Sequence, residues 1–424
     1  MAYVPVAFIL AGMAAYTVLA GADFGAGLWT LLALGPSGPR VRDQARHAMG
    51  PVWEANHVWL IFVLVVCWTA YPVAFGSITS TLSAPLLIAA IGIIFRGSAY
   101  ALRGVADASR TAENLLGLSS VLTPFALGTA VGAIAVGRVP VGNAAGNLVT
   151  SWLSPAPVLV GALAVAFSAY LAAVFLAADS LRYGEADLAG VFRRRALIAG
   201  VVSGALALAG LLVMRGSGLD LTHGAALVLV CVSGVAGLAT LALCYLSRFG
   251  LARLTAALAV AAVVVGWAAA QAPRFLPGMT VVQAAAGRAT LVALVIAVAC
   301  GSVVLIPSLA LLFTLFLRGR LDTPEQHAPE AAPVAPVGQA AAPGDAATPA
   351  TDAAAVPAAA AGAPGATVRS GTTRRWSAAA VVGLVAGTGL LVFADAPWAR
   401  VLGVAALVLC AVAVFALTAA PLDR

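Results

Sequence analysis

The sequence predicts an all-α polytopic membrane protein whose core consists of nine transmembrane helices. Hydrophobic residues make up 62% of the 424 residues and charged residues only 9%, whereas an ordinary soluble domain has about 25% charged residues. The mean hydropathy is +1.02, and apolar windows of about 20 residues, the length that crosses a bilayer, recur along the chain. No basic cluster is interleaved with aromatic residues, so we expect no nucleic acid among the partners.

Each core helix is predicted from an apolar window bounded by polar, proline or glycine residues. The first window runs unbroken over 3–34, and it is too long and lacks the basic start of a cleavable signal peptide. The second, 52–73, follows Pro51, which suits the first helical turn because a proline has no N–H to leave unpaired there. The remaining core helices are expected at 79–102, 115–137, 155–178, 196–214, 223–246, 252–271 and 288–317.

The composition changes abruptly after the core. Residues 321–375 consist mainly of Ala, Pro, Gly, Thr and Asp without periodicity, which indicates a disordered tether. Two further apolar windows, 376–395 and 398–420, predict a two-helix transmembrane hairpin. The predicted domains are therefore the core (1–320), the tether and an appendage (376–424).

The distribution of arginine predicts the orientation in the cell membrane. The formal net charge of +7 comes from arginine alone, because the sequence contains no lysine. The connections that follow the odd-numbered core helices are rich in arginine, and loops of this kind face the cytoplasm. We therefore expect an outside N-terminus and a cytoplasmic tether. The arginines of these connections are Arg40, Arg42, Arg46, Arg103, Arg110, Arg182, Arg193, Arg194, Arg195, Arg248 and Arg253.

Ionisable residues inside the predicted helices mark the candidate site. Asp23 lies roughly 16 Å from the predicted inner end of its helix, Glu54 about 5 Å into the second helix, and Arg96 about six residues from the end of the third. Charged groups at such depths are costly and mark ion or proton routes by default. We predict a proton uptake path from the cytoplasm through Asp23, Glu54, Arg96 and the neighbouring Ser98.

Each of these charges also has a structural interpretation, and the sequence leaves both open. The Arg96 guanidinium could extend to the interface, and Glu54 could be a surface acid favoured by the dipole of a helix N-terminus. Asp23 lies too deep for either and could be a structural acid paired to an arginine. Gly21 and Gly25 bracket Asp23 as a small-xxx-small pair, which favours a closely packed, lipid-shielded place for its carboxylate.

The helix that carries Glu54 contains further polar and aromatic residues. Trp53 and His57 share a helical face with Glu54, whereas Asn56 is expected to hydrogen-bond to a neighbouring helix. His57 and His47 are candidate haem ligands, but neither has a partner at ligand spacing, so we expect no haem on this chain. The five cysteines lie in apolar windows without CxxC spacing, and no metal site or disulfide framework is predicted.

Six motifs follow one another along residues 1 to about 318. They are Gly21-Ala-Asp23-Phe24-Gly25-Ala-Gly27, Pro51-Val-Trp53-Glu54-Ala-Asn56-His57-Val-Trp59-Leu60, Tyr71-Pro72, Phe95-Arg96-Gly97, Gly266-Trp267 with Gln271-Ala-Pro273, and Pro307-Ser308-Leu309. In this order they resemble subunit II of the bacterial cytochrome bd quinol oxidases. The tether and the appendage lie outside the usual pattern of that family.

The resemblance implies an oxidase that takes electrons from membrane quinol, with menaquinol expected, and reduces dioxygen to water. Two b-type haems and one d-type haem would be bound by subunit I, and this chain would be its nine-helix partner without a cofactor of its own. A small accessory subunit is left open. Asp23, Glu54 and Arg96 would form the hydrophilic route to the haem site, and Trp59 would line an oxygen route. Glu54 departs from the family, in which many members carry Asp.

Two other functions compete with this interpretation. A secondary transporter would show inverted repeats and broken helices at the membrane midplane. The chain shows no convincing duplication, and its polar residues cluster toward one face. A purely structural membrane subunit remains the second alternative, because the sequence alone does not show that protons use these acids.

Overall fold

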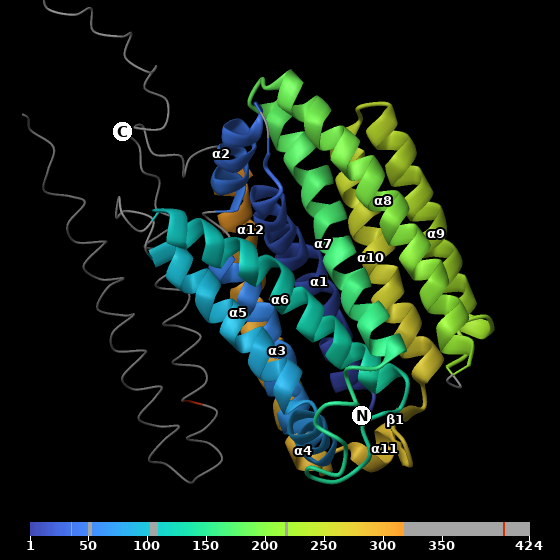
Figure 1. The fold of residues 1–424 in the computed structure, drawn as a ribbon. Helices are drawn as coiled ribbons and strands as arrows, with labels where there is room; N and C mark the ends of the chain where they lie inside the picture. The colour runs from blue at the N-terminus through green and yellow to red at the C-terminus, as the bar shows by residue number, and fades with distance from the viewer. Residues whose placement is uncertain (35, 50–52, 102–108, 217–218, 318–401, 403–424) are drawn as a thin grey trace, which may run out of the picture. The chain divides into compact units, whose positions relative to one another are not determined.

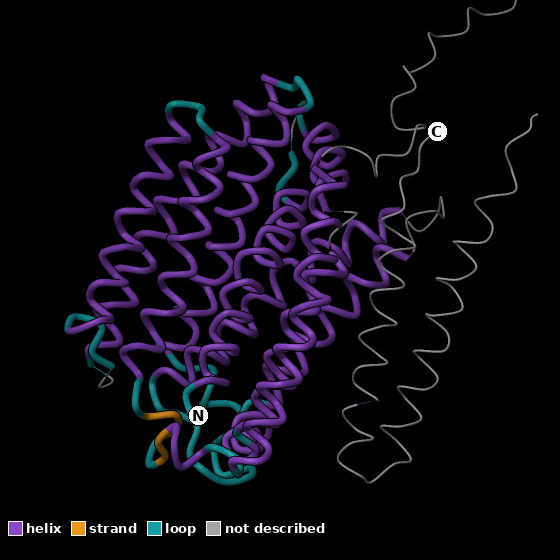
Figure 2. The backbone as a smooth tube through the Cα atoms, turned by 180° about the vertical axis from the view of Figure 1, so that it is seen from behind, coloured by secondary structure: helices purple, strands orange, loops and turns teal. Residues whose placement is uncertain are grey.

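The computed structural model describes residues 1–34, 36–49, 53–101, 109–216, 219–317 and 402, and almost all of them are helical (Figures 1 and 2). Eight of the described helices are long and apolar enough to cross a membrane. They are α1 (Val4–Leu31), α5 (Ser83–Ala101), α6 (Ser109–Ala135), α7 (Pro155–Arg182), α8 (Ala186–Arg215), α9 (Gly224–Tyr245), α10 (Phe249–Gln271) and α12 (Arg288–Leu317).

The all-α membrane architecture is therefore confirmed. With α3 (Trp53–Ala70), which is apolar over 55–70, the described helices correspond to the nine predicted for the core. Residues Met1–Ile296 form one compact unit, to which every feature described below belongs. The predicted tether (321–375) and, apart from Leu402, the predicted appendage (376–424) lie outside the described residues.

The apolar windows fail to predict α2 (Gly38–Met49). This helix is amphipathic: it buries Val41 and Ala45 completely and carries arginines on its other faces. Because polar residues lower the mean hydropathy of such a helix, a search for apolar windows passes over it. Its arginines anchor it: Arg40 pairs with Glu185 before α8, and Arg42 donates to the carbonyl of Ala33 at 2.9 Å.

The windows also misplace the boundaries between the second and third predicted helices. In the structure α3 ends at Ala70, a separate short helix α4 (Pro72–Thr81) follows Tyr71, and α5 begins at Ser83. Pro72 has no N–H to continue the hydrogen bonding of α3, so the chain turns at Tyr71 and starts a new helix. The apolar composition continues across this turn, which is why the windows do not resolve it.

Two groups of helices meet along a seam, where α7 packs against α1 and α6. One group contains α1, α3, α5 and α6, and the other contains α7, α8, α9 and α10 (Figure 1). Helix α1 packs against α7 at very short range, because a Cβ on Gly25 would lie 1.8 Å from the carbonyl oxygen of Ser168. Only glycine permits this approach of two backbones.

The two ends of the compact unit carry different elements. One end, here called the α2 end, carries α2 and the turn between α7 and α8 (Figure 1). The opposite end, here called the N-terminal end, carries α4, α11 (Val281–Ala284) and the antiparallel ribbon of β1 (Arg274–Leu276) and β2 (Met279–Thr280).

An apolar cluster closes the N-terminal end. The ring of Tyr71 packs on Phe275 with centroids 4.8 Å apart, and its hydroxyl donates to the carbonyl of Ala2 at 2.5 Å. The connection between α6 and α7 lies across α4, where Ser77 Oγ and Ser80 Oγ accept backbone N–H groups at 2.9 and 2.8 Å. The buried members of this cluster include Tyr71, Leu82, Val139, Trp152 and Leu276.

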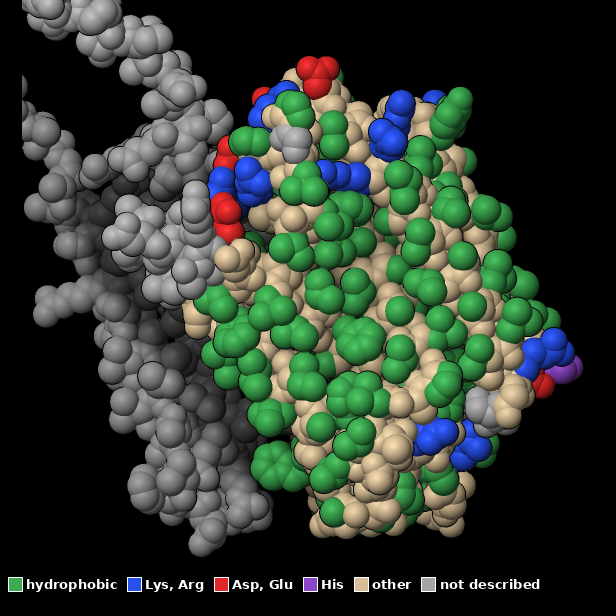
Figure 3. Space-filling model, viewed as in Figure 1, with side chains coloured by type: hydrophobic (Ala, Val, Ile, Leu, Met, Phe, Trp, Pro, Cys, Tyr) green, Lys and Arg blue, Asp and Glu red, His purple; other side chains and the backbone are tan. Residues whose placement is uncertain are grey.

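The surface has an apolar middle and charged ends, as expected for a membrane protein. Figure 3 shows a face whose middle is covered by apolar side chains, with charged side chains gathered near the upper margin and in smaller groups at the lower right. Charged groups at the two ends of long apolar helices fit a protein whose middle contacts lipid.

Candidate functional site

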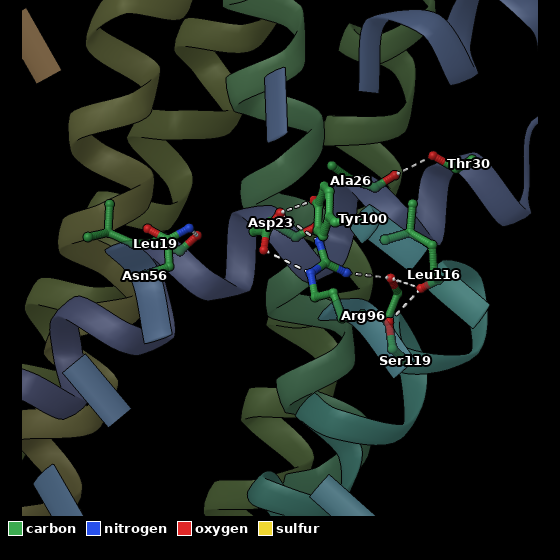
Figure 4. Close-up of polar contacts among 10 residues, drawn as sticks. Leu19, Asp23, Ala26, Thr30, Asn56, Arg96, Tyr100, Leu116 and Ser119 are labelled. Carbon is green, nitrogen blue, oxygen red and sulfur yellow. Dashed lines mark hydrogen bonds and ion pairs between the residues drawn. The ribbon is translucent and has the colours of Figure 1, made fainter. Parts of the chain in front are cut away.

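Asp23 and Arg96 meet inside the first helix group and form a buried ion pair. The side chain of Arg96 is 0% exposed and that of Asp23 is 2% exposed. Arg96 Nε donates to Asp23 Oδ2 at 2.9 Å, and Nη2 donates to Oδ1 at 2.6 Å and to the Asp23 carbonyl at 2.7 Å (Figure 4). Paired N–H···O bonds of this kind are the strongest contacts between arginine and a carboxylate.

Three helices complete the surroundings of the pair. From α6, Ser120 Oγ accepts from Arg96 Nη1 at 3.2 Å and itself donates to the Leu116 carbonyl at 2.6 Å. From α5, the Tyr100 hydroxyl lies 3.4 Å from Asp23 Oδ1. The guanidinium carbon of Arg96 also lies 4.8 Å from the ring centroid of Phe24 on α1. The charge is therefore held by hydrogen bonds and an aromatic face.

The glycines around Asp23 make room for these contacts. A Cβ on Gly27 would lie 2.0 Å from Ser120 Oγ, in the space that the serine needs to reach Arg96. Gly25 is needed for the approach to α7, whereas a Cβ on Gly21 would lie 3.4 Å from its nearest neighbour, Leu171 Cδ1. The predicted small-xxx-small pair is therefore close-packed at Gly25 and looser at Gly21.

The pair lies nearer to the α2 end than to the N-terminal end. Asp23 is eight residues before Leu31, the last residue of α1, which corresponds to about 12 Å. From Val4, at the other end of α1, the distance along the helix is about 29 Å. The sequence places Asp23 and Arg96 at different depths, and the structure joins them into one unit because the long arginine side chain reaches across.

Of the other predicted pathway residues, Ser98 does not join the pair in the contacts that the structure describes. It is half-buried, and its hydroxyl donates to the Ile94 carbonyl of its own helix at 2.9 Å. Glu54 and Trp53 belong to the first turn of α3, but their side chains lie outside the described part of the chain.

Polar and aromatic residues of α3 continue from the pair along α1. The buried Asn56 lies against α1, with Nδ2 3.4 Å from the Leu19 carbonyl (Figure 4). The His57 ring is contacted edge-on by Tyr16 and Phe24, with centroids 5.9 and 6.0 Å away. Its surroundings are those of a packed side chain. Within the described ranges, no three His, Cys, Asp or Glu residues could together hold a metal ion.

The remaining predicted aromatic, Trp59, lies further along α3. It is half-buried and forms an edge-to-face pair with Phe62 at 6.3 Å. Neither ring contacts the ion pair in the described interactions, so the structure gives Trp59 a packing partner and leaves its oxygen-route role a prediction.

Sequence reasoning missed Ser120, Tyr100 and Tyr16. Tyr100 follows Arg96 by four residues and Tyr16 precedes Asp23 by seven, so helical spacing alone would place each on the face of a predicted site residue. The buried hydroxyl of Tyr16 has no hydrogen-bond partner among the described residues. Ser120 carries no such signal, because Ser119 beside it looks the same in sequence.

A second internal ion pair joins α7 to α10. Arg253 Nη2 lies 2.5 Å from Asp179 Oδ1, and the two side chains are 25% and 17% exposed. The same nitrogen donates to the Phe175 carbonyl at 2.7 Å.

Outside the spanning segments, hydrogen bonds from Thr222 lower the pKa of the Asp220 carboxyl to about 2.

The sequence of the chain is similar to one described family and to two named relatives. The family model described as cytochrome bd terminal oxidase subunit II matches residues 1–316. Two relatives come from Bacillus subtilis (strain 168). One is named "Putative cytochrome bd menaquinol oxidase subunit II" and is 24% identical over 202 residues, 47% of this chain and 58% of the relative. The other, "Cytochrome bd ubiquinol oxidase subunit 2", is 30% identical over 113 residues, 26% of this chain and 33% of the relative. The aligned parts thus span less than two thirds of either relative.

A solved structure shows the same fold. A chain in the structure of the bd oxidase from Geobacillus thermodenitrificans superimposes with a TM-score of 0.63 and 23% identity, over 74% of this chain and 98% of that chain. At this identity the similarity establishes the architecture of the helices.

Proposed function

The chain belongs to the cytochrome bd terminal oxidase subunit II family, whose model matches nearly all of its core, and we propose that it is the non-haem subunit of a bacterial quinol:dioxygen oxidoreductase. Its partner would be the haem-bearing subunit I, in a heterodimer that reduces dioxygen to water. Menaquinol is the proposed electron donor, in line with the name of one Bacillus subtilis relative.

We place the haems in the partner subunit. The two b-type haems and the d-type haem would supply electron transfer and oxygen reduction when bound there. On this chain, the ring of His57 is contacted edge-on by Tyr16 and Phe24, which is the environment of a packed side chain. For this chain we propose a role in the supply of protons.

The buried Asp23–Arg96 pair is the observation that carries the proton proposal. A fully desolvated ion pair contributes little to stability, because the cost of removing both charges from water offsets their attraction. Ionisable groups inside membrane helices are instead associated with ion and proton routes. The hydroxyls of Ser120 and Tyr100 border the pair, and a hydroxyl can both accept and donate a hydrogen bond.

The direction of uptake follows from the two ends of the molecule. The N-terminal end is closed by the apolar cluster around Tyr71, whereas Asp23 lies about 12 Å from the α2 end. The arginine-rich α2 end would face the cytoplasm, with the N-terminus outside. Protons would therefore enter from the cytoplasm, with Glu54 of α3 as the proposed first acid and Asp23 next. Moving each elementary charge across the membrane changes the free energy by about 2.3 kcal/mol per 100 mV of transmembrane potential.

The test separates a proton route from a structural tie. Asp23→Asn alone would leave the Arg96 charge buried without its counterion, so lost activity would be ambiguous. The double variant Asp23→Asn/Arg96→Gln removes both charges; asparagine matches aspartate in volume, and glutamine keeps a polar amide on a shorter side chain than arginine. We expect the purified complex to keep its haem spectrum and to lose quinol oxidase turnover by at least about tenfold. Wild-type turnover in an intact complex would leave the scaffold role as the better interpretation.

The matched control is Asp179→Asn/Arg253→Gln, which removes the other internal ion pair. This pair is partly open to solvent, and the proposal gives it no part in proton transfer. Its removal should leave turnover near the wild-type value. Equal losses in both double variants would indicate a general effect on packing and would contradict the proposed route.

A further inference from the structure

A cavity lies at the N-terminal end, away from the ion pair and unused by the proposed function. Its volume is about 350 Å³, and it opens between the end of α6, the start of α7 and the end of α8. The lining residues are Val136, Arg138, Ser154, Pro155, Ala156, Val213 and Gly216. This lining combines one cation, one hydroxyl and apolar side chains, and it contains no carboxylate.

Ser154 has a buried hydroxyl that lacks its usual partner. It is the N-cap residue of α7 and is only 9% exposed, yet its side chain makes no capping bond. Its Oγ has no hydrogen-bond partner among the described residues. An N-cap serine normally accepts from the N–H of the second or third helical residue. Here Pro157 stands in the third position and has no N–H, so the sequence itself removes one capping donor.

Two further donors line the same cavity. The N–H of Ala156, in the second position of α7, has no acceptor within the helix, and it lies at the positive end of the helix dipole. Arg138 is exposed and donates one long bond, from Nη1 to the Thr150 carbonyl at 3.5 Å. A guanidinium has five N–H donors, so it can still bind two oxygens of an anion.

We propose that this cavity binds a phosphate group, and specifically the phosphodiester of a membrane phospholipid. The phosphate would be held by the Arg138 guanidinium, the Ser154 hydroxyl and the Ala156 N–H, a donor set typical of anion sites at helix N-termini. Spanning helices α6, α7 and α8 begin or end here, which is the depth of lipid headgroups. Val136 and Val213 line the cavity beside these donors, and their apolar surface suits the start of an acyl chain.

Native mass spectrometry of the delipidated complex tests the proposal. The probes are dioleoylphosphatidylglycerol and, in a separate arm, sodium phosphate. We expect one phosphatidylglycerol to bind more tightly than the rest, and Arg138→Gln to weaken that binding by about tenfold, the order expected for one arginine–phosphate contact. The matched control Arg274→Gln removes an arginine from the same end but outside the cavity, and it should leave this binding unchanged.

Pro157→Ala provides an independent variant that does not remove charge. It gives Ser154 an N–H to cap, which should weaken lipid binding while the thermal stability of the complex is kept or raised. Unchanged phosphatidylglycerol binding in Arg138→Gln, or an equal loss in Arg274→Gln, would overturn the site. Competition by millimolar sodium phosphate would assign the site to a free anion and would overturn the lipid assignment.

Discussion

Among the described residues, each of the two helix groups contains one internal ion pair of aspartate and arginine, and the two pairs differ mainly in their access to water. The Asp23–Arg96 contact, at 2.6 Å, joins α1 to α5, and the Asp179–Arg253 contact, at 2.5 Å, joins α7 to α10. Arg96 is fully buried, whereas Arg253 is 25% exposed. Nearly the same bond length therefore occurs in two very different dielectric environments.

The position of each pair explains the difference. Asp179 lies three residues before Arg182, the last residue of α7, where water at the α2 end can reach it. Asp23 lies deeper, and the pair that it forms with Arg96 is contacted by side chains of α1, α5 and α6. A pair near the end of a helix can anchor two helices at low cost, whereas a pair in the interior costs desolvation that anchoring does not repay. The interior pair is therefore the one for which a chemical role is the better explanation.

The largest effect is expected from breaking the interior pair on one side. Arg96→Gln leaves the carboxylate of Asp23 buried without a cation, which should cost about 3–5 kcal/mol of stability. Thermal unfolding and yield of the purified complex measure the loss, with Arg253→Gln as the comparison. Similar unfolding temperatures for the two single variants would remove the distinction between the pairs.

The next effect concerns the seam between the helix groups. Gly25→Ala places a Cβ against the Ser168 carbonyl, so α1 and α7 must separate, at a cost of about 1–3 kcal/mol. Gly21→Ala places its Cβ 3.4 Å from Leu171 Cδ1 and 3.7 Å from Ser168 Oγ, and should be nearly neutral. Thermal unfolding of the two variants in parallel checks this. A larger loss for Gly21→Ala would mean that the seam is closest elsewhere.

A smaller effect is expected at the partly exposed pair. Asp179→Asn leaves Arg253 with the Phe175 carbonyl and access to water, so the loss should be about 1 kcal/mol or less. Chemical denaturation measures the loss, and quinol oxidase turnover measured beside it should not change. A loss comparable to that of Arg96→Gln would show that exposure is not what separates the two pairs.

The smallest effect is expected at the surface of α2. The pair of Arg40 and Glu185 is half-exposed on both sides, and such pairs contribute little and are screened by salt. Arg40→Gln should change stability by less than about 0.5 kcal/mol, and the difference should vanish in 1 M salt. A salt-independent loss would indicate that Arg40 has a buried role that its exposure does not suggest.

The fold was largely predictable because lipid imposes one simple rule on the chain. Long apolar helices must cross the bilayer, and their windows are visible in sequence. The rule says nothing of α2, which lies outside the apolar windows, and it does not divide α4 from α5, since both are apolar. Pro72 begins α4 and marks the turn after α3, but the apolar residues on both sides of it keep the hydropathy of the window high.

The candidate site was predictable only residue by residue. Asp23 and Arg96 stand out because a charge in an apolar window is rare. Their pairing depends on the distance between α1 and α5, which the sequence does not contain. Ser120 was missed because most hydroxyls in membrane helices bond to their own backbone, as Ser98 does here. Only the packing of the helices in the structure shows which serine contacts Arg96.

Proton uptake during a single turnover tests the central claim most directly. The wild-type and Asp23→Asn/Arg96→Gln complexes would be reconstituted in vesicles, and a pH dye would follow protons consumed as the reduced enzyme reacts with oxygen. If protons pass through the interior pair, uptake in the double variant should slow by at least about tenfold, while quinol still reduces the haems at the normal rate. Uptake at the wild-type rate would contradict the account and assign the pair to the architecture of the membrane core.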